Sequence, residues 1–314
     1  MIMKKASERI EAIGEILEKK NYDIITDYGS GNYCFDIIAS KKDDKKRLII
    51  HTAEDIQQCS RNIAQDMKKL AMTVDGVPLL VGSKMGKREL ETGVLYKKHG
   101  ILAIDLDTLE IFLAEKQHPL IYADKGGLYV KINPKKLKLA RLEKGFSLGE
   151  LAQKIGVSRK AVYEYERGNM DVTLDVAIKL EEVLDADLIE PIGKLEDIIK
   201  WNIEKEKTEL NDQTIASLYR ILSKAGFNVL LFRKTPFDIA ARKEEIGKRI
   251  IVKNARKRIE EKEISLLSDI AELIKALVLL VVKHGHNKFL FEKSEKLQVI
   301  NERFIRKIEE ILIV

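Results

Sequence analysis

A short segment combines a serine with several hydrogen-bonding side chains at the start of an expected helix. Arg159 and Lys160 follow Ser158, and Tyr163 and Glu164 come one helical turn later. On a helix these four side chains project outward near the N-terminus, where their polar groups can hydrogen-bond to base edges. The helix dipole and the amides next to Ser158 also favour a phosphate oxygen. The segment therefore predicts recognition of a nucleic acid.

Serine and glycine residues predict the helices that hold this segment. Ser147 can cap one helix, with Glu150 three residues later completing a capping box. Three glycines, Gly145, Gly156 and Gly168, can end helices or make a tight turn. The pattern predicts a helix-turn-helix centred on residues 134 to 187, with residues 158–167 as the recognition helix and Thr173 capping the fourth helix.

Positive charge gathers on the same segment. From Lys131 to Arg167 there are 10 Lys and Arg residues against 4 Glu, a net charge of +6. Such an excess attracts the phosphate backbone with a strength that falls as salt rises. The side chains expected to contact the backbone are Ser147, Lys135, Lys136, Lys138 and Lys154.

These residues resemble the Cro/phage-repressor (XRE) class of helix-turn-helix domains. The matching pattern is L-x-x-A-R-x-x-x-G-x-S, then L-A-x-x-x-G-V-S-R, then E-R-G, over about one sixth of the chain. The resemblance implies a lambda-repressor-like helical domain in which Arg141 pairs with Glu166 and locks the first helix to the third. It also implies that the four outward-facing residues read bases and that Ser158 contacts a phosphate or a base. One departure is Leu148, where many members carry Gln.

On both sides of this segment, short apolar runs alternate with amphipathic helices, which predicts α/β domains. The flanks also resemble each other: KAGFNVLLFRKTPFDIAARKEEIGKRIIVKNA matches KKNYDIITDYGSGNYCFDIIASKKDDKKRLIIHTA, with Asp238 at the position of Asp36. We expect two related α/β domains, and two unrelated ones are the alternative. The expected domains are residues 1–124, 125–192 and 193–314, with the stretch before Pro134 as a linker.

The flanking repeats resemble the restriction-endonuclease-like fold of Holliday-junction resolvases, in which a strand aspartate and a later E-x-K motif hold a cation that activates water. Asp36 and Asp238 occupy the aspartate position. The E-x-K position reads Ile-His-Thr from Ile50 in the first copy and Ile-Val-Lys ending at Lys253 in the second. A magnesium site with one carboxylate is poor chemistry, so we expect both copies to be non-catalytic scaffolds without metal or cofactor. Lys253 and the basic residues 256–258 either touch the DNA backbone or form a solvated face.

The whole layout resembles an archaeal family named putative HTH-type transcriptional regulatory proteins. The runs GVPLLVGSKMGKRELETGVLYKKHGI and GGLYVKINPKKLKLARLEKGFSLGELA carry this resemblance. It implies a regulator of transcription that binds double-stranded DNA and is not an enzyme. We expect a homodimer, since each chain has one helix-turn-helix. The alternatives are a metal-dependent nuclease guided by the helix-turn-helix, and a protein-interaction adaptor of the transcription or repair machinery. The sequence names no small-molecule effector.

Composition indicates a cytoplasmic protein. With 314 residues and 45% hydrophobic residues, the chain can form two or three domains with real cores. Two cysteines without a C-x-x-C spacing indicate reduced thiols. No apolar run approaches the roughly 18 residues of a membrane span, so we expect no membrane partner.

Overall fold

A computed structural model describes residues 2–27, 33–41, 44–114, 120–192, 212–255, 259–282, 297–301 and 308. Contacts within the chain divide it into two compact units. The first unit holds residues 1–52, 59–79 and 201–314, and the second holds residues 53–58 and 80–200. None of the described helices has the length and apolar character that a membrane crossing requires.

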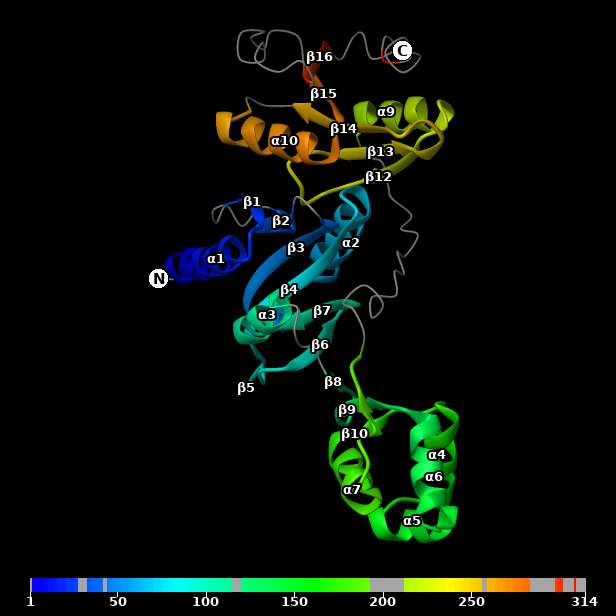
Figure 1. Cartoon of the computed structure of the whole chain (residues 1–314). Coiled ribbons are helices and arrows are strands. Elements are labelled where there is room, and N and C mark those ends of the chain that lie inside the picture. Colours follow the sequence, from blue (N-terminus) through cyan, green and yellow to red (C-terminus); the bar gives the residue numbers. More distant parts are fainter. Residues whose placement is uncertain are drawn as a thin grey trace. The chain divides into compact units, whose positions relative to one another are not determined.

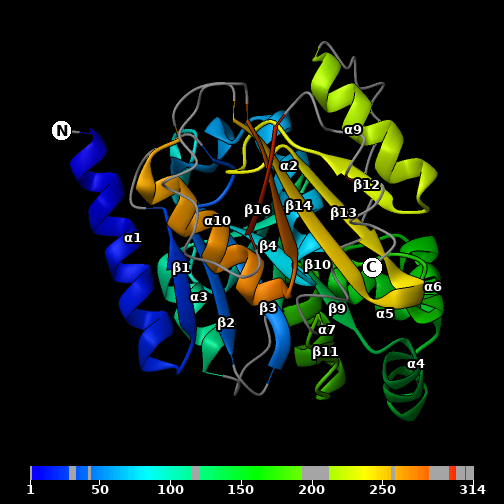
Figure 2. The same cartoon turned by 90° about the horizontal axis from the view of Figure 1, so that it is seen from above.

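The first α/β copy contains α1 (Ile2–Lys19), β1 (Asp23–Thr26), β2 (Ile37–Lys41), β3 (Asp44–Asp55), a 3-10 helix (Ile56–Gln58), α2 (Arg61–Thr73) and β4 (Gly76–Met85). Strands β1, β2 and β3 pair antiparallel. Helix α1 lies along β1 and β2 (Figure 2) and buries Ile10, Ile13 and Leu17, which are spaced three and four residues apart. In β4 the residues from Val77 to Gly82 are all buried, as expected for an apolar strand inside a sheet.

The second α/β copy contains α9 (Gln213–Lys224), β12 (Asn228–Leu231), β13 (Ile239–Lys243), a 3-10 helix (Glu244–Ile246), β14 (Lys248–Ala255), α10 (Glu261–Ile274), β15 (Leu277–Val282) and β16 (Leu297–Asn301). The strands form a five-stranded sheet in the order β12-β13-β14-β15-β16. Successive side chains of β15 point to opposite faces. Leu279 and Val281 pack on the side of α9, whereas Leu280 and Val282 pack with Ile264 of α10.

The two copies repeat the same strand pairing. Ile37 of β2 lies opposite Ile50 of β3, and Ile239 of β13 lies opposite Val252 of β14. Both partners in the second copy follow those in the first by 202 residues. The expected fold class, α/β structure around a helical segment, is confirmed, and the shared pairing supports the view that the two copies are related.

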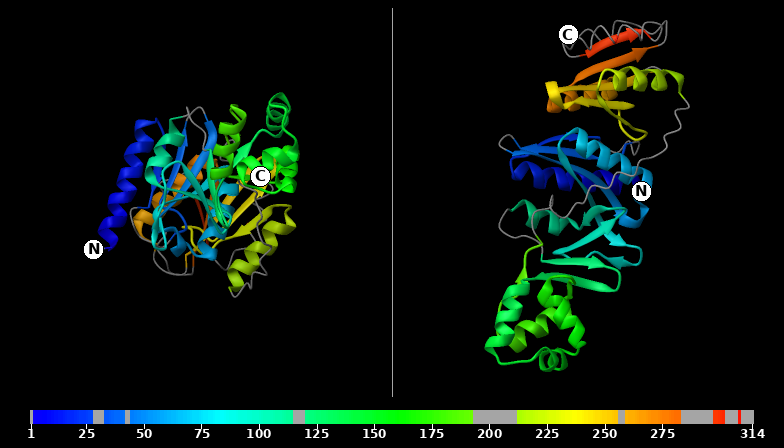
Figure 3. Two further views of the ribbon diagram at one scale, coloured as in Figure 1. Left: turned by 90° about the horizontal axis from the view of Figure 1, so that it is seen from below. Right: turned by 90° about the vertical axis from the view of Figure 1, so that its right-hand side faces the viewer.

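The second unit also contains β5 (Arg88–Glu89), β6 (Val94–Lys98), β7 (Ile101–Ile104), β8 (Ile121–Asp124), β9 (Gly127–Ile132), β10 (Val172–Thr173) and β11 (Ile189–Glu190), with α3 (Leu106–Leu113) after β7. The interpretation of the stretch before Pro134 as a linker is wrong, because most of it is β9. Strand β9 pairs with β8, β10 and β11, and β8 pairs in parallel with β6. The helices that follow β9, coloured green, form one group in Figure 3. The helical segment is therefore joined to the second unit's sheet by strand hydrogen bonds.

Four helices follow β9: α4 (Pro134–Glu143), α5 (Leu148–Ile155), α6 (Arg159–Arg167) and α7 (Leu174–Leu184) (Figure 1). Buried residues from all four helices share one core with Val130 of β9; they include Leu137, Leu151, Val162 and Leu180. All five are fully buried. Because β9 contributes to this core, the helices and the strand form one packed domain.

Candidate nucleic-acid interface

The turn between α5 and α6 is fixed by side-chain caps. The hydroxyl of Ser147 accepts the amide of Glu150 at 3.2 Å, and the Glu150 carboxylate accepts the amide of Ser147 at 2.7 Å, so the expected capping box is present. These hydrogen bonds hold the pKa of Glu150 below its usual value. Gly156 ends α5 with φ of 77°, a left-handed conformation that favours glycine. Ser158 then accepts the amide of Ala161 at 3.1 Å and starts α6.

The predicted base-reading residues lie on the outer side of α6. Arg159, Lys160 and Tyr163 are exposed, and Glu164 is half-buried. Within the described part of the chain, Arg159 and Lys160 have no ion-pair or hydrogen-bond partner for their side chains. They are therefore available to bind a phosphate or a base edge.

The other two outward residues are already held by neighbours. The hydroxyl of Tyr163 accepts a hydrogen bond from Arg167 at 2.9 Å, and the same guanidinium lies 5.4 Å from the Tyr163 ring centroid. Glu164 accepts the side-chain amide of Asn169 at 2.8 Å. These contacts orient Tyr163 and Glu164 before any ligand is present, which lowers the entropy lost on binding.

A buried ion pair ties α4 to α6. Arg141 Nε lies 2.5 Å from Glu166 Oε1, and Arg141 Nη2 lies 3.1 Å from Glu166 Oε2. Arg141 also donates to the carbonyl of Phe146 at 2.7 Å. The hydrogen bond to Glu166 raises the pKa of Arg141. Both side chains are less than a tenth exposed, so this pair positions the helices and is not free to contact DNA.

The residues predicted to contact the DNA backbone lie near the ends of α4 and α5. Lys135, Lys136 and Lys138 are exposed on α4, whose N-terminus is capped by Asn133. A Cβ on Gly168, at the end of α6, would come within 3.1 Å of Pro134, so the start of α4 lies beside the end of α6. The structure thus places Lys135 and Lys136, at the start of α4, near the end of the recognition helix.

Lys154 lies in the last turn of α5. It is exposed, and its ammonium lies 5.1 Å from the ring centroid of Phe146. Ser147, at the N-cap of α5, is exposed, with its oxygen engaged in the capping box. Thr173 occupies the N-cap position of α7 as expected, but its side chain makes no capping hydrogen bond.

Sequence reasoning missed the polar cluster that anchors the loop after α6. Asp171 accepts hydrogen bonds from Tyr122 of β8 and from Lys131 of β9, the latter at 2.6 Å. The ring of Tyr122 stacks on Tyr129 at 5.8 Å. The alternation of Leu128 and Val130 with polar residues is the signal that could have revealed β9.

The aspartates at the nuclease-like positions have local partners in both copies. Asp36 accepts the amide of Thr52 at 2.6 Å and lies 3.2 Å from His51 Nδ1. Asp238 accepts the amide of Asn254 at 2.7 Å. Burial raises the pKa of Asp238, whereas the Asn254 hydrogen bond opposes this rise.

The E-x-K comparison between the two copies was out of register by one residue. Because Ile50 is equivalent to Val252, Lys253 is equivalent to His51 and not to Thr52. Lys253 forms an ion pair with Glu263 at 2.6 Å. The lysine is therefore engaged within its own copy, and the basic residues 256–258 lie outside the described residues.

Neither the expected alignment of the two copies nor the corrected one places a carboxylate at the glutamate position of the E-x-K motif. The residues at the glutamate position are apolar and buried in both copies; they are Ile49, Ile50, Ile251 and Val252. Within the described ranges, no three His, Cys, Asp or Glu residues are grouped so that they could hold a metal ion.

Two known families match parts of the chain. The family described as "PD-(D/E)XK superfamily domain" matches residues 6–119, and the family described as "Helix-turn-helix" matches residues 137–190. The predicted nuclease-like fold of the first copy and the predicted helix-turn-helix are both confirmed.

Relatives cover nearly all of the chain. A protein from Methanocaldococcus jannaschii named "Putative HTH-type transcriptional regulatory protein" is 32% identical over 99% of this chain and 95% of its own length. A protein of the same name from Pyrococcus horikoshii is 34% identical over 88% of this chain and 86% of its own. Among solved structures, a chain of the SinR protein/SinI protein complex is 27% identical over 30% of this chain and 82% of its own, with a TM-score of 0.17. That score is too low to carry an argument about the fold.

Proposed function

Because the chain belongs to the family of putative HTH-type transcriptional regulatory proteins, we propose that it is a sequence-specific regulator that reads duplex DNA with α6. The exposed start of α6 carries this proposal. Arg159 and Lys160 have no partner among the described residues, and either can bind guanine O6 and N7 or a phosphate. Tyr163, held by Arg167, supplies an oriented ring and hydroxyl beside them.

The same surface provides contacts to the DNA backbone. Lys135 and Lys136 lie next to the end of α6, and Lys154 lies on α5. Contacts of this kind set the register of the protein on the duplex, whereas the α6 residues set the sequence. With one helix-turn-helix per chain, a two-fold homodimer would read two half-sites about 34–36 Å apart.

The two α/β copies serve in this proposal as scaffold and dimer interface and not as nucleases. The apolar residues at the glutamate position and the ion pair of Lys253 with Glu263 support this assignment. In this proposal the protein acts in the cytoplasm with three domains. Residues 1–124 and 193–314 form the scaffold and the dimer interface, and residues 125–192 recognise DNA.

The test begins with selection of a preferred duplex from a random pool, followed by gel shifts with the selected DNA. Arg159→Ala combined with Lys160→Ala should weaken specific binding by roughly thirtyfold to twenty-thousandfold, since each of two good base contacts contributes about 1–3 kcal/mol. Lys179→Ala on α7 is the matched control, because Lys179 is also exposed and lies on another helix of the same domain. Unchanged binding by the double variant would remove α6 from the mechanism. Negligible duplex affinity of the unaltered protein would favour a protein-interaction adaptor.

The scaffold assignment has its own test. Incubation with linear or branched DNA and magnesium or manganese should give no cleavage. Cleavage that disappears in Asp36→Ala or Asp238→Ala would instead support a nuclease guided by the helix-turn-helix.

A further inference from the structure

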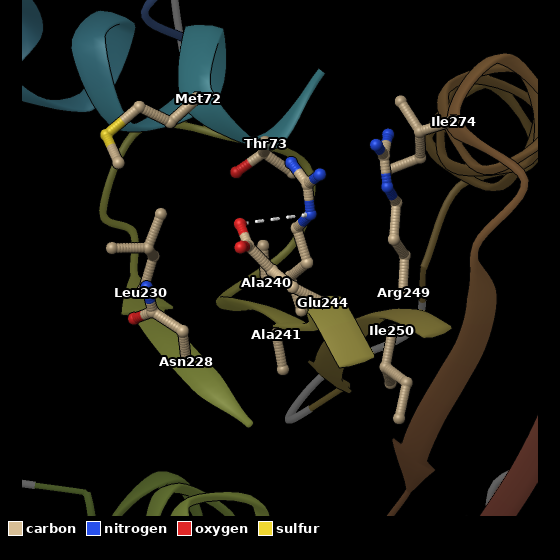
Figure 4. Close-up of a pocket in the computed structure, with 11 residues that line it drawn as sticks. Met72, Thr73, Asn228, Leu230, Ala240, Ala241, Glu244, Arg249, Ile250 and Ile274 are labelled. Carbon is tan, nitrogen blue, oxygen red and sulfur yellow. Dashed lines mark ion pairs between the residues drawn. The ribbon is translucent and has the colours of Figure 1, made fainter. Parts of the chain in front are cut away.

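Two polar clusters outside the recognition surface join elements that are distant in sequence. One lies between the two α/β copies, where Arg242 is 2.9 Å from Asp75 and 3.7 Å from Glu244, the latter contact drawn as a dashed line in Figure 4. Arg249 also binds Asp75, so both arginines have carboxylate partners inside the protein and serve the packing of the two copies. The other cluster joins the loop after α6 to β8 and β9.

This second cluster, which we call the Asp171 cluster, consists of Tyr122 of β8, Lys131 of β9 and Asp171. The Asp171 carboxylate accepts a hydrogen bond from the Tyr122 hydroxyl, and its two oxygens lie 2.6 and 2.7 Å from the Lys131 ammonium. Burial raises the pKa of Tyr122, and the hydrogen bond to Asp171 raises it further. The phenol therefore stays protonated and donates to the carboxylate.

The loop of residues 169–171 is held at both of its ends. It lies between Gly168, which ends α6, and strand β10. Asn169 donates its side-chain amide to the Glu164 carboxylate at 2.8 Å and its backbone amide to the Glu164 carbonyl at 3.1 Å. Asp171, at the other end of the loop, is held by β8 and β9. The Asp171 cluster therefore connects the C-terminal end of α6 to the β8–β9 hairpin.

The β8–β9 hairpin is in turn fixed to the sheet of the second unit. Tyr122 pairs with Tyr129 of β9 on one side and with the buried Leu95 of β6 on the other. The rings of Tyr122 and Tyr129 stack with their centroids 5.8 Å apart. The Tyr129 hydroxyl donates to the carbonyl of Lys125 at the hairpin turn, at 3.2 Å. Tyr122 thus holds Asp171 from a position that strand pairing and ring stacking have already set.

We propose that Asp171 is a positioning residue for DNA recognition: by binding Tyr122 and Lys131 it fixes the C-terminal end of α6, and sequence-specific binding depends on this contact. The inference rests on the proposed function of α6. Because α6 is a single helix of nine residues, a displacement of its C-terminal end also tilts the side chains at its start, Arg159 and Lys160.

The two kinds of DNA binding respond differently to such a tilt. Specific binding requires the α6 side chains to meet base edges in one register, so its apparent affinity falls with the fraction of molecules in which α6 is correctly placed. Non-specific binding depends on charge near the phosphate backbone and carries no sequence information. Loss of the Asp171 contacts should therefore lower the ratio of specific to non-specific affinity.

Competition gel shifts with the full-length protein measure this ratio, with the selected duplex and a scrambled duplex of the same composition at one salt concentration. Tyr122→Phe removes the hydroxyl while keeping the stacked ring and the net charge. The ratio should fall by about threefold to tenfold, because a hydrogen bond to a charged group is strong but partial exposure of Asp171 weakens it. The matched control is Tyr129→Phe, the same change at the paired residue, whose hydroxyl binds Lys125 and not the loop after α6. It should leave the ratio unchanged.

A second variant tests whether Tyr122 acts through Asp171. Asp171→Ala removes both contacts and should lower the ratio by about tenfold or more; the lost negative charge strengthens both kinds of binding, so the ratio is the quantity to compare. Adding Tyr122→Phe to Asp171→Ala should lower the ratio no further, since both changes remove the same hydrogen bond. A further loss in the combined variant contradicts the assigned route.

The outcomes separate this inference from the proposed function. If the unaltered protein binds no duplex, the proposed function fails and the role of Asp171 fails with it. If the unaltered protein selects its sequence and Tyr122→Phe selects it equally well, only the role of Asp171 is overturned. Equal losses of specific and non-specific binding in Tyr122→Phe would indicate general damage to the fold and also overturn it.

Discussion

Removal of Glu166 isolates the charge of Arg141 in the core of the helical domain. Arg141 and Glu166 are 9% and 8% exposed, and their bidentate contact joins α4 to α6. In Glu166→Ala, Arg141 would keep only its hydrogen bond to Phe146. Leaving one partner of a buried pair uncompensated costs about 3–5 kcal/mol. We expect the free energy of local unfolding of the helical domain to fall by that amount.

Hydrogen exchange followed by mass spectrometry is the suitable measurement, because a chain with two contact units need not unfold in one step. Peptides from α4 and α6 should exchange about a hundredfold to several thousandfold faster in Glu166→Ala. The exposed pair Lys144 and Asp185, 3.8 Å apart and 42% and 90% exposed, provides the control. Lys144→Ala should change the free energy of local unfolding by less than about 1 kcal/mol.

A double variant distinguishes an isolated charge from lost packing. Replacing both residues by leucine removes the buried charges together, so Arg141→Leu with Glu166→Leu should destabilise less than Glu166→Ala alone. If the double variant unfolds as readily as Glu166→Ala, or if Glu166→Ala behaves like Lys144→Ala, the electrostatic account of this pair is incorrect.

Three further outcomes follow from the site and the nuclease-like positions. Ser158→Ala should destabilise α6 by about 1 kcal/mol in hydrogen exchange, because it removes the cap on Ala161; an effect as large as that of Glu166→Ala would contradict a simple capping role. Lys135→Ala with Lys136→Ala should reduce the magnitude of the slope of log affinity against log salt concentration by about 2 while leaving the preferred DNA sequence unchanged. An altered sequence preference would show that these lysines contact bases and not the DNA backbone. Asp238 has a raised pKa in the folded protein, so its contribution to stability is greatest when it is protonated and falls as the pH rises from the pKa of the unfolded state through the pKa of the folded state. Asp238→Asn should flatten this pH dependence when denaturation is measured at several pH values, and an unchanged profile would contradict the assignment.

The helix-turn-helix could be predicted in detail because local residues determine its turns. Ser147, Glu150 and Ser158 make the caps that their spacing implies, and Gly156 adopts the left-handed conformation that ends α5. The pairing of Arg141 with Glu166 followed from the family resemblance, since no local rule joins residues 25 positions apart. Its geometry depends on how α4 and α6 pack.

The strand β9 was missed because its hydrogen-bond partners are distant in sequence. Val130 pairs with Ile121 on one side and with Val172 on the other, and Val172 lies beyond the recognition helix. The glycines 126 and 127 were interpreted as linker residues, yet they make the turn of the β8–β9 hairpin, where both have positive φ. A turn and a flexible linker use the same residue types, and only the alternating apolar residues after the turn distinguish them.

The register error between the two copies has a similar origin, since both strands carry consecutive isoleucine and valine residues. Apolar residues alone cannot fix the alignment of such runs, but charged residues can. Arg47 and Arg249 are 202 residues apart, the same interval as Asp36 and Asp238. In the structure Arg47 binds a carbonyl at the end of α10, and Arg249 binds Asp75 just after α2. Each arginine thus contacts the end of the other copy's helix, so the repeat in the sequence serves the packing of one copy against the other.

Within each copy, the two aspartates have a structural role that needs no metal. Asp36 and Asp238 each accept the amide of the residue 16 positions later, Thr52 and Asn254, beyond the last strand pair of β2 with β3 and of β13 with β14. A buried strand amide without a partner is costly, so a carboxylate at this place stabilises the end of the pairing. Asparagine offers the same acceptor without the charge, whereas alanine does not. Asp36→Asn should therefore preserve more of the first copy's stability than Asp36→Ala, and equal losses in thermal denaturation would show that the charge, and not the accepted hydrogen bond, is what the fold requires.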